Sequence, residues 1–294
     1  MVHFAGQTLD VAEIETTSTV ERALEEESRG STLQSSVHQA QRRYRVHVTL
    51  SVETYTDSIK KHSVALATIA PAVLDVPVEH CPGWTVSDVL QHLIEVQWFW
   101  ATIVEQRRNT RVEDGRPVSV ERSKLVERFL IGADHLVQVL GDADQSDHVW
   151  TWSPLQNDVA FVTRHQVQEI MVHHWDVAHA AGTTLKLATD VATDAIAEFL
   201  TLSVSSDADP LDPPGEPFAG RLGLWSTDAN EGWTLQDASS PGTVRFNSGL
   251  DTGVPTLSGS SSDLLLWLYS RLDVVGDSEA QELGRRLHAL SPTA

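Results

Sequence analysis

The sequence predicts an α+β protein in which a helical bundle, over about residues 51–205, precedes a small α/β C-terminal domain over 218–294. Apolar residues recur every three or four positions in the first part, which is typical of helices. Short apolar runs separated by turn residues follow in the second part, which favours strands. The proline-rich stretch 206–217 separates the two and is predicted to be a linker. Residues 1–50 contain almost no aromatic residue, and we expect a disordered tail there.

Five helices are predicted in the first part from apolar spacing and from residues that can cap a helix start. The second of them follows a capping box, Thr85-Val86-Ser87-Asp88. A glycine after the fourth, Gly182, supplies its C-terminal stop. The predicted starts or bounds are, in chain order, Ser51, Thr85, Ser119, 161–181 and Thr189.

The second part is predicted to contain four short strands and two helices. Turn residues, notably Pro241-Gly242, separate the strands. The expected strands are 220–226, 232–235, 243–246 and 255–258, and the expected helices are 262–272 and 278–290.

Composition excludes several classes of function. Asp and Glu number 41 against 21 Lys and Arg, and the net charge of −20 argues against nucleic acid and against an anionic membrane as partners. The longest apolar runs, such as Leu264–Leu268, are too short for a bilayer, which needs about 20 residues. The one cysteine, Cys81, excludes an internal disulfide and fits a cytoplasmic protein.

A polar stripe on the fourth predicted helix is the first candidate site. Glu169 and His173 are four residues apart, so both lie on one helix face and can converge on one ion. His165 and Asp176 extend the stripe, and apolar residues flank it on both sides. The alternative is an ordinary charged pair at a solvated surface.

A histidine on the second predicted helix adds a third donor. His92 is in register with the apolar residues Val89 and Val96. Taken alone, it is more simply a core histidine bonded to a carbonyl group. With Glu169 and His173, however, it supplies three ligands of the types that zinc prefers and leaves a fourth position open, which is the pattern of a catalytic zinc site.

Three segments resemble one family. They are Cys81-Pro-Gly-Trp-Thr-Val-Ser-Asp-Val-Leu-Gln-His92-Leu, Arg164-His-Gln-Val-Gln-Glu169-Ile-Met-Val-His173-His-Trp-Asp176 and Leu257-Ser-Gly-Ser-Ser-Ser-Asp-Leu-Leu-Leu-Trp267-Leu-Tyr-Ser-Arg271. Each resembles a signature of the mycothiol-dependent maleylpyruvate isomerase family, and they occur in the order of that family over about residues 55–275.

The resemblance implies a DinB-like up-down four-helix bundle with a divalent metal, usually zinc, and a C-terminal domain packed against it. By position it implies His92, Glu169 and His173 as the metal ligands and a catalytic role for Arg271, for which a helix-end cation is the alternative. It also implies mycothiol as the thiol cosubstrate, so Cys81 is better explained as a small residue before a turn than as a nucleophile. His174 departs from the family, which often has arginine there.

These features together predict a metal-dependent isomerase or thiol S-transferase that acts on a small electrophile. A zinc-bound thiol is deprotonated at neutral pH, and a thiolate adds readily to an activated double bond. Two alternatives stay open at the level of sequence. One is a non-catalytic metal-binding module for sensing or partner contact, and the other is a structural bundle whose histidines are core residues.

Overall fold

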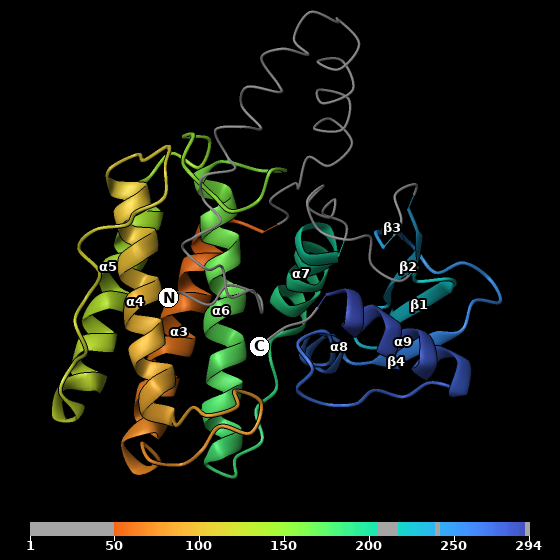
Figure 1. Cartoon of the computed structure of the whole chain (residues 1–294), viewed down its shortest axis with the longest axis horizontal. Helices are drawn as coiled ribbons and strands as arrows, with labels where there is room; N and C mark the ends of the chain where they lie inside the picture. Colours follow the sequence, from red (N-terminus) through yellow and green to blue (C-terminus); the bar gives the residue numbers. More distant parts are fainter. Residues whose placement is uncertain (1–49, 205–216, 239–241, 292–294) are drawn as a thin grey trace, which may run out of the picture.

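Four long helices lie side by side and form the first part of the structure (Figure 1). The first, α3, packs against α5 and α6, and α4 packs against the same two helices. The computed structural model describes residues 50–204, 217–238 and 242–291, so the predicted tail and linker fall almost wholly outside the described residues. The four helices are α3 (Val52–Ile69), α4 (Val86–Glu105), α5 (Leu125–Asp142) and α6 (Val159–Ala180).

Local hydrogen bonds define most of the helix ends. The hydroxyl of Ser51 accepts from the backbone N–H of Thr54 at the start of α3, and the predicted capping box of Thr85 and Asp88 is present at the start of α4. Asp158 caps α6 by accepting from Phe161 N–H at 2.9 Å. Gly182 has a φ of +71°, a conformation that glycine adopts without strain, and it follows the end of α6 as predicted.

Two predicted caps are wrong because their segments make contacts elsewhere in the fold. Ser119 does not start a helix, since α5 begins at Leu125 after the 3₁₀ turn η3 (Arg122–Lys124). The adjacent Val120 N–H donates instead to the side chain of Gln91 on α4. Helix α7 (Thr189–Phe199) begins at Thr189 with Ala188 in the cap position, and the Thr189 hydroxyl donates to Asp228 in the second domain.

Aromatic side chains fill the centre of the bundle. Trp100 is fully buried and lies within 6.2 Å, between ring centres, of Phe99, Trp150 and Phe161. These rings come from α4, from the loop before α6 and from α6 itself, so their packing holds these segments together. None of the described helices combines the length and the apolar character that crossing a membrane requires.

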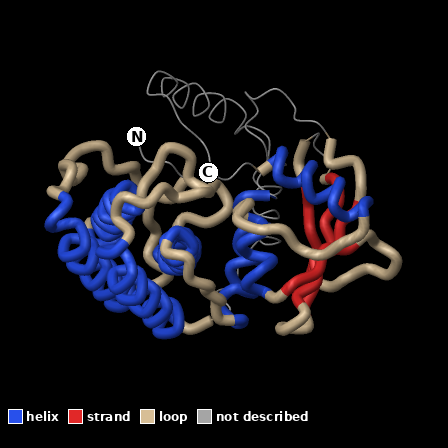
Figure 2. The backbone as a smooth tube through the Cα atoms, turned by 90° about the horizontal axis from the view of Figure 1, so that it is seen from below, coloured by secondary structure: helices blue, strands red, loops and turns tan. Residues whose placement is uncertain are grey.

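The second part is a small domain built on a four-stranded sheet, which lies at the end of the molecule away from the bundle (Figure 2). The strand order is β3-β2-β1-β4, with β1 parallel to β4 and the other neighbours antiparallel. Helix α9 packs on β1 and β4, and α8 packs on the same strands. The elements are β1 (Arg221–Ser226), β2 (Glu231–Asp237), β3 (Val244–Ser248), β4 (Thr256–Gly259), α8 (Ser261–Leu268) and α9 (Ser278–Leu290).

The α+β class and the order of the two parts are therefore as predicted. The expected helix 262–272 is shorter than predicted, because α8 ends at Leu268. Arg271 consequently lies beyond the helix, two residues after the C-cap Tyr269, whose carbonyl accepts a hydrogen bond from its guanidinium. Helix α7 and the following π-helical turn η4 (Leu200–Val204) connect the bundle to this domain, and α7 packs on both α6 and α8.

Asp228 joins α7 to the second domain. Its carboxylate accepts from the hydroxyls of Thr189 on α7 and Ser226 on β1, and from the backbone N–H of Ser261 at the start of α8, all within 2.9 Å. Partial burial raises the pKa of Asp228, but these hydrogen bonds outweigh it and lower the pKa from 3.8 to about 2. The charged carboxylate is therefore stabilised in the folded state.

The Asp228 contacts predict an acid-dependent contribution to stability. Because the folded pKa is depressed, the contribution is complete above pH 3.8 and is lost as the pH falls toward about 2. Replacing Asp228→Asn should lower the free energy of unfolding by about 1 kcal/mol at neutral pH, solvent screening included. The difference between wild type and variant, measured by urea unfolding at a series of pH values, should shrink in that window. A difference that does not change with pH would contradict this.

Candidate metal centre

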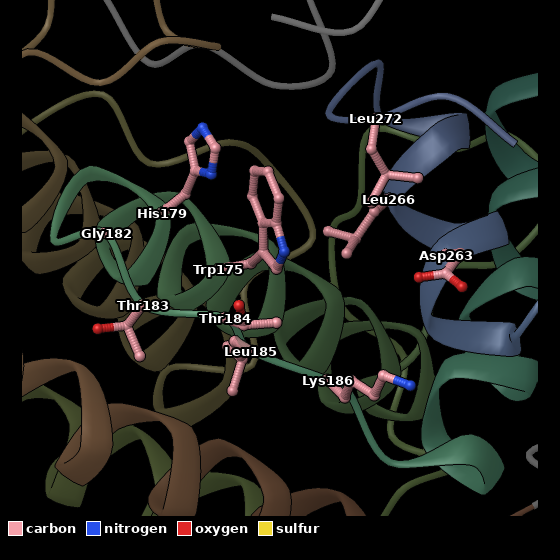
Figure 3. Close-up of a pocket in the computed structure, with 10 residues that line it drawn as sticks. All are labelled: Trp175, His179, Gly182, Thr183, Thr184, Leu185, Lys186, Asp263, Leu266 and Leu272. Atoms are coloured by element: carbon pink, nitrogen blue, oxygen red, sulfur yellow. The ribbon is translucent and has the colours of Figure 1, made fainter.

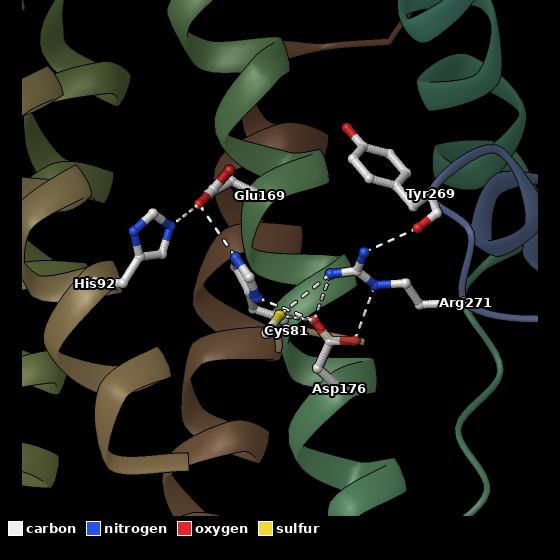
Figure 4. A network of polar contacts seen from close by, with 7 residues as sticks. Cys81, His92, Glu169, Asp176, Tyr269 and Arg271 are labelled. Atoms are coloured by element: carbon white, nitrogen blue, oxygen red, sulfur yellow. Dashed lines mark hydrogen bonds and ion pairs between the residues drawn. The ribbon is translucent and has the colours of Figure 1, made fainter. Parts of the chain in front are cut away.

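Three donor side chains from two helices converge between α4 and α6 (Figure 4). His92 Nε2 lies 2.7 Å from Glu169 Oε1, and His173 Nε2 lies 3.5 Å from the same oxygen. One donor atom from each of the three residues lies within 4.8 Å of those of the other two. The structure thus brings together the three residues that the sequence singled out as ligands.

The helices themselves position this triad. Glu169 and His173 are one turn apart on α6, so their side chains leave the same face. His92 is held on the facing side of α4 by the buried neighbours Val89 and Val96. The indole of Trp84 lies 5.1 Å from the ring of His92 and 6.4 Å from that of His173, so one aromatic ring covers both imidazoles.

The electrostatics of the triad favour a charged carboxylate between its two histidines. Burial alone would raise the pKa of Glu169, but hydrogen bonds with His173 and His92 outweigh it and hold the pKa well below its usual range. Burial would lower the pKa of His173, but contacts with Asp176, Cys81 and Glu169 hold it well above its usual range. The carboxylate of Glu169 and the imidazole of His173 are thus both favoured in their charged forms.

Behind the triad, Asp176 fixes the ring of His173. Its Oδ2 lies 3.1 Å from His173 Nδ1, which leaves Nε2 directed to Glu169. Arg271, from the second domain, donates to both oxygens of Asp176 at 3.0 Å and to the Tyr269 carbonyl at 2.8 Å. Burial raises the pKa of Asp176, but His173 and Arg271 lower it to about 2. A buried ion pair therefore connects the second domain to the candidate site.

Cys81 is buried on the Asp176 side of His173. Its Sγ lies 3.7 Å from Asp176 Oδ2 and 3.5 Å from Arg271 Nη2. With His173 and Asp176 it forms another group of potential metal donors. The thiol therefore belongs to the network around Arg271, although the sequence favoured a packing role for it.

The polar stripe of α6 continues toward α7 and the second domain. His165 Nδ1 lies 3.2 Å from Glu198 of α7, and the Tyr269 hydroxyl donates to Gln168 at 3.0 Å. Sequence reasoning found His165 but missed Glu198 and Tyr269. Tyr269 lies within the segment that ends at Arg271 and could have been found there, whereas nothing near Glu198 in the sequence indicates its partner.

His174, which departs from the family pattern, faces a different helix. Its Nδ1 lies 2.9 Å from Nδ1 of His62 on α3, and both rings are buried. Burial lowers the pKa of His62 to about 3 and that of His174 to about 4. Both imidazoles are therefore neutral, and one donates while the other accepts.

The donor chemistry of the triad fits a divalent cation. Zinc in catalytic sites takes three protein ligands, commonly histidine nitrogens and a carboxylate oxygen, and keeps an open position. A ligand histidine usually gives its second nitrogen to a carboxylate, as His173 does to Asp176. His92 and His173 through Nε2, with Glu169, would hold such an ion.

Comparison with known proteins shows that the bundle is similar to a known domain family. Residues 56–178 match the family model described as the mycothiol maleylpyruvate isomerase N-terminal domain. The match covers the four long helices of the bundle almost completely. All three members of the triad lie in the matched region of the isomerase N-terminal domain, whereas Arg271 lies outside it. A search of curated proteins gives no significant match.

Solved structures extend the likeness to the second domain. A crystal structure of the mycothiol-dependent maleylpyruvate isomerase matches with a TM-score of 0.56 and 14% identity, covering 78% of this chain and 94% of that chain. A variant of that enzyme with one histidine changed to alanine matches with a TM-score of 0.54 and 13% identity over the same shares. At this level of identity, the similarity shows only that this chain and the isomerase have the same fold.

The buried ion pair of Asp176 and Arg271 is expected to be strongly coupled. Asp176→Ala or Arg271→Ala alone should cost about 3–5 kcal/mol of unfolding free energy, because each leaves one uncompensated buried charge. The double variant should cost less than the sum, with a coupling energy of about 1–3 kcal/mol in a urea double-mutant cycle. The exposed pair Arg286 and Glu282 serves as control and should show no measurable coupling. Additive costs at Asp176 and Arg271 would contradict the expectation.

Proposed function

We propose that this protein is a metal-dependent enzyme that holds zinc through His92, Glu169 and His173 and uses mycothiol as its thiol cosubstrate. The observation that carries the proposal is the convergence of these three donors within a mycothiol maleylpyruvate isomerase N-terminal domain. Its substrate would be a small electrophile, and the protein would work in the cytoplasm. The solved structures that share its fold are those of a mycothiol-dependent maleylpyruvate isomerase, which supports the thiol and the isomerase chemistry for this chain.

Each residue of the site has a distinct part in this proposal. His92 and His173 provide nitrogen donors, and Glu169 provides the charge that balances a cation. Asp176 holds the Nδ1 proton of His173 and so keeps Nε2 available. A bound zinc ion would act as a Lewis acid that lowers the pKa of a thiol.

In this proposal, Arg271 is a positioning residue. Its guanidinium lies on Asp176 and on the Tyr269 carbonyl, so its effect on the ligands passes through Asp176. This interpretation gives a physical form to the catalytic role that the sequence resemblance implies. Substitution of Arg271 by lysine would keep the charge but lose the two-pronged contact with Asp176.

The reaction we propose follows from the chemistry of thiols. Mycothiol supplies a sulfur whose addition to a double bond conjugated with a carbonyl, and later expulsion, lets the former double bond rotate, as in a maleylpyruvate isomerase. If the sulfur stays on the electrophile, the same site performs S-transfer. Exclusion of water by the buried surroundings of His173 and Asp176 would protect the thiolate.

Metal content and thiol dependence test the proposal together. Untagged wild type should retain one zinc per chain at the triad after dialysis, and His173→Ala should lose that equivalent, as measured by elemental mass spectrometry. His135→Ala, which removes an exposed histidine paired with Glu105, is the control and should keep it. Wild type, but not His173→Ala, should convert maleylpyruvate or another electrophile from a panel only when mycothiol is present.

The other outcomes identify the alternatives. Retained zinc without mycothiol binding in calorimetry would indicate a non-catalytic metal-binding module. An equal zinc content in wild type and His173→Ala would reduce the triad to core residues. Either result would contradict the proposed enzyme.

Orientation of His173 by Asp176 gives a further prediction. Asp176→Asn keeps the size of the side chain but weakens its acceptor, so zinc affinity should fall about 10–100-fold. Competition with a chromogenic chelator measures this change. An unchanged affinity in a folded variant would show that Asp176 does not act on the ligand.

A further inference from the structure

A second group of metal-donor side chains lies at the C-terminal end of α6. Glu79 and His80 come from the loop before α4, and His179 comes from the last turn of α6. His179 Nε2 lies 2.8 Å from Glu79 Oε2, and one donor atom of each of the three residues lies within 4.8 Å of those of the other two. None of these residues belongs to the triad at Glu169.

One indole holds both imidazoles of this group. The ring of Trp175 stacks on His179 at 4.7 Å with an angle of 8° between the planes, and it lies 5.6 Å from the ring of His80. Figure 3 shows Trp175 and His179 next to each other at the edge of a pocket between α6 and α8. Rings that are already held in place lose little freedom on binding an ion, which favours affinity.

Two of the three groups, His80 and Glu79, are favoured in the forms that bind a metal. Burial and the positive charge of Arg271 lower the pKa of His80, so its imidazole is neutral at neutral pH. The hydrogen bond from His179 lowers the pKa of Glu79, which is therefore a carboxylate. The side chains of His179 and Glu79 are 43% and 69% exposed, so an ion can reach them from solvent.

We infer that Glu79, His80 and His179 form a second binding site for a borderline divalent cation such as Zn²⁺. Two histidine nitrogens and one carboxylate oxygen are a donor set that zinc prefers, and water can complete the coordination. Donors about 2.0–2.1 Å from a tetrahedral zinc are roughly 3.3 Å apart. The donor atoms now lie within 4.8 Å of one another, and rotation of the exposed Glu79 side chain can bring its carboxylate closer to the two imidazoles.

The site would fasten the loop before α4 to the end of α6. That loop carries Cys81, which contacts Arg271, and Trp84, which covers His92 and His173. A cation on Glu79, His80 and His179 would therefore restrain two residues that touch the network around the triad, without itself being a part of it.

Zinc titration of the untagged full-length chain tests this inference. Calorimetry with Zn²⁺ alone should show one binding event fewer, or one at least about tenfold weaker, in His80→Ala and in His179→Ala than in wild type. Each of these variants should keep the event that His173→Ala removes, so the two sites are distinguishable. The control His135→Ala loses a similarly exposed His–Glu pair that belongs to no group of three donors in the described part of the chain, and it should match wild type.

Hydrogen exchange locates the bound ion. In His173→Ala, Zn²⁺ should slow amide exchange in residues 73–85 and at the end of α6, and the addition of His179→Ala should abolish this protection. Equal Zn²⁺ stoichiometry and affinity in wild type, His80→Ala and His179→Ala would overturn the inference. Protection that persists without His179 would overturn it as well.

Discussion

The ion pair between Asp176 and Arg271 is the interaction on which the rest of the site depends. Both side chains are buried, and neither charge could stay there alone without a cost of several kcal/mol. Asp176 comes from the bundle and Arg271 from the second domain, so the pair can form only when the two parts are packed together. The same carboxylate contacts Nδ1 of His173, so the packing of the two domains and the orientation of a candidate metal ligand depend on one side chain.

Helix α6 carries further buried polar residues that pair with neighbouring helices. It is buried over most of its surface, and its polar residues therefore need partners on whatever element faces them. Arg164 forms a two-pronged ion pair with Asp194 of α7, which also accepts from Tyr55 of α3. Further along, His174 meets His62. These contacts point in different directions, so together they fix both the position and the rotation of α6.

Features that depend on neighbouring residues could be predicted from the sequence, whereas contacts between distant residues could not. The capping box at Thr85, the glycine at 182 and the four-residue spacing of Glu169 and His173 act within one turn, so the sequence alone reveals them. The predicted caps at Ser119 and Thr189 are wrong, and both segments form hydrogen bonds with residues far away in the sequence. The partner is Gln91 for the first segment and Asp228 for the second. The same reason hides the partner of His165, since Glu198 is 33 residues away. The domain boundaries and the ligand roles stay predictions.

His174 differs from the residue that the sequence resemblance implies, and its side chain pairs with His62 on α3. Arginine at this position, as the sequence resemblance implies, would add a positive charge on α6 next to a candidate ligand. Here the residue is a neutral imidazole that pairs with another neutral imidazole on α3. The charge that remains on the Asp176 side of His173 is that of Arg271, which the second domain supplies. A chain in which His174 is neutral therefore depends on the packing of the second domain for the positive charge of Arg271 beside Asp176.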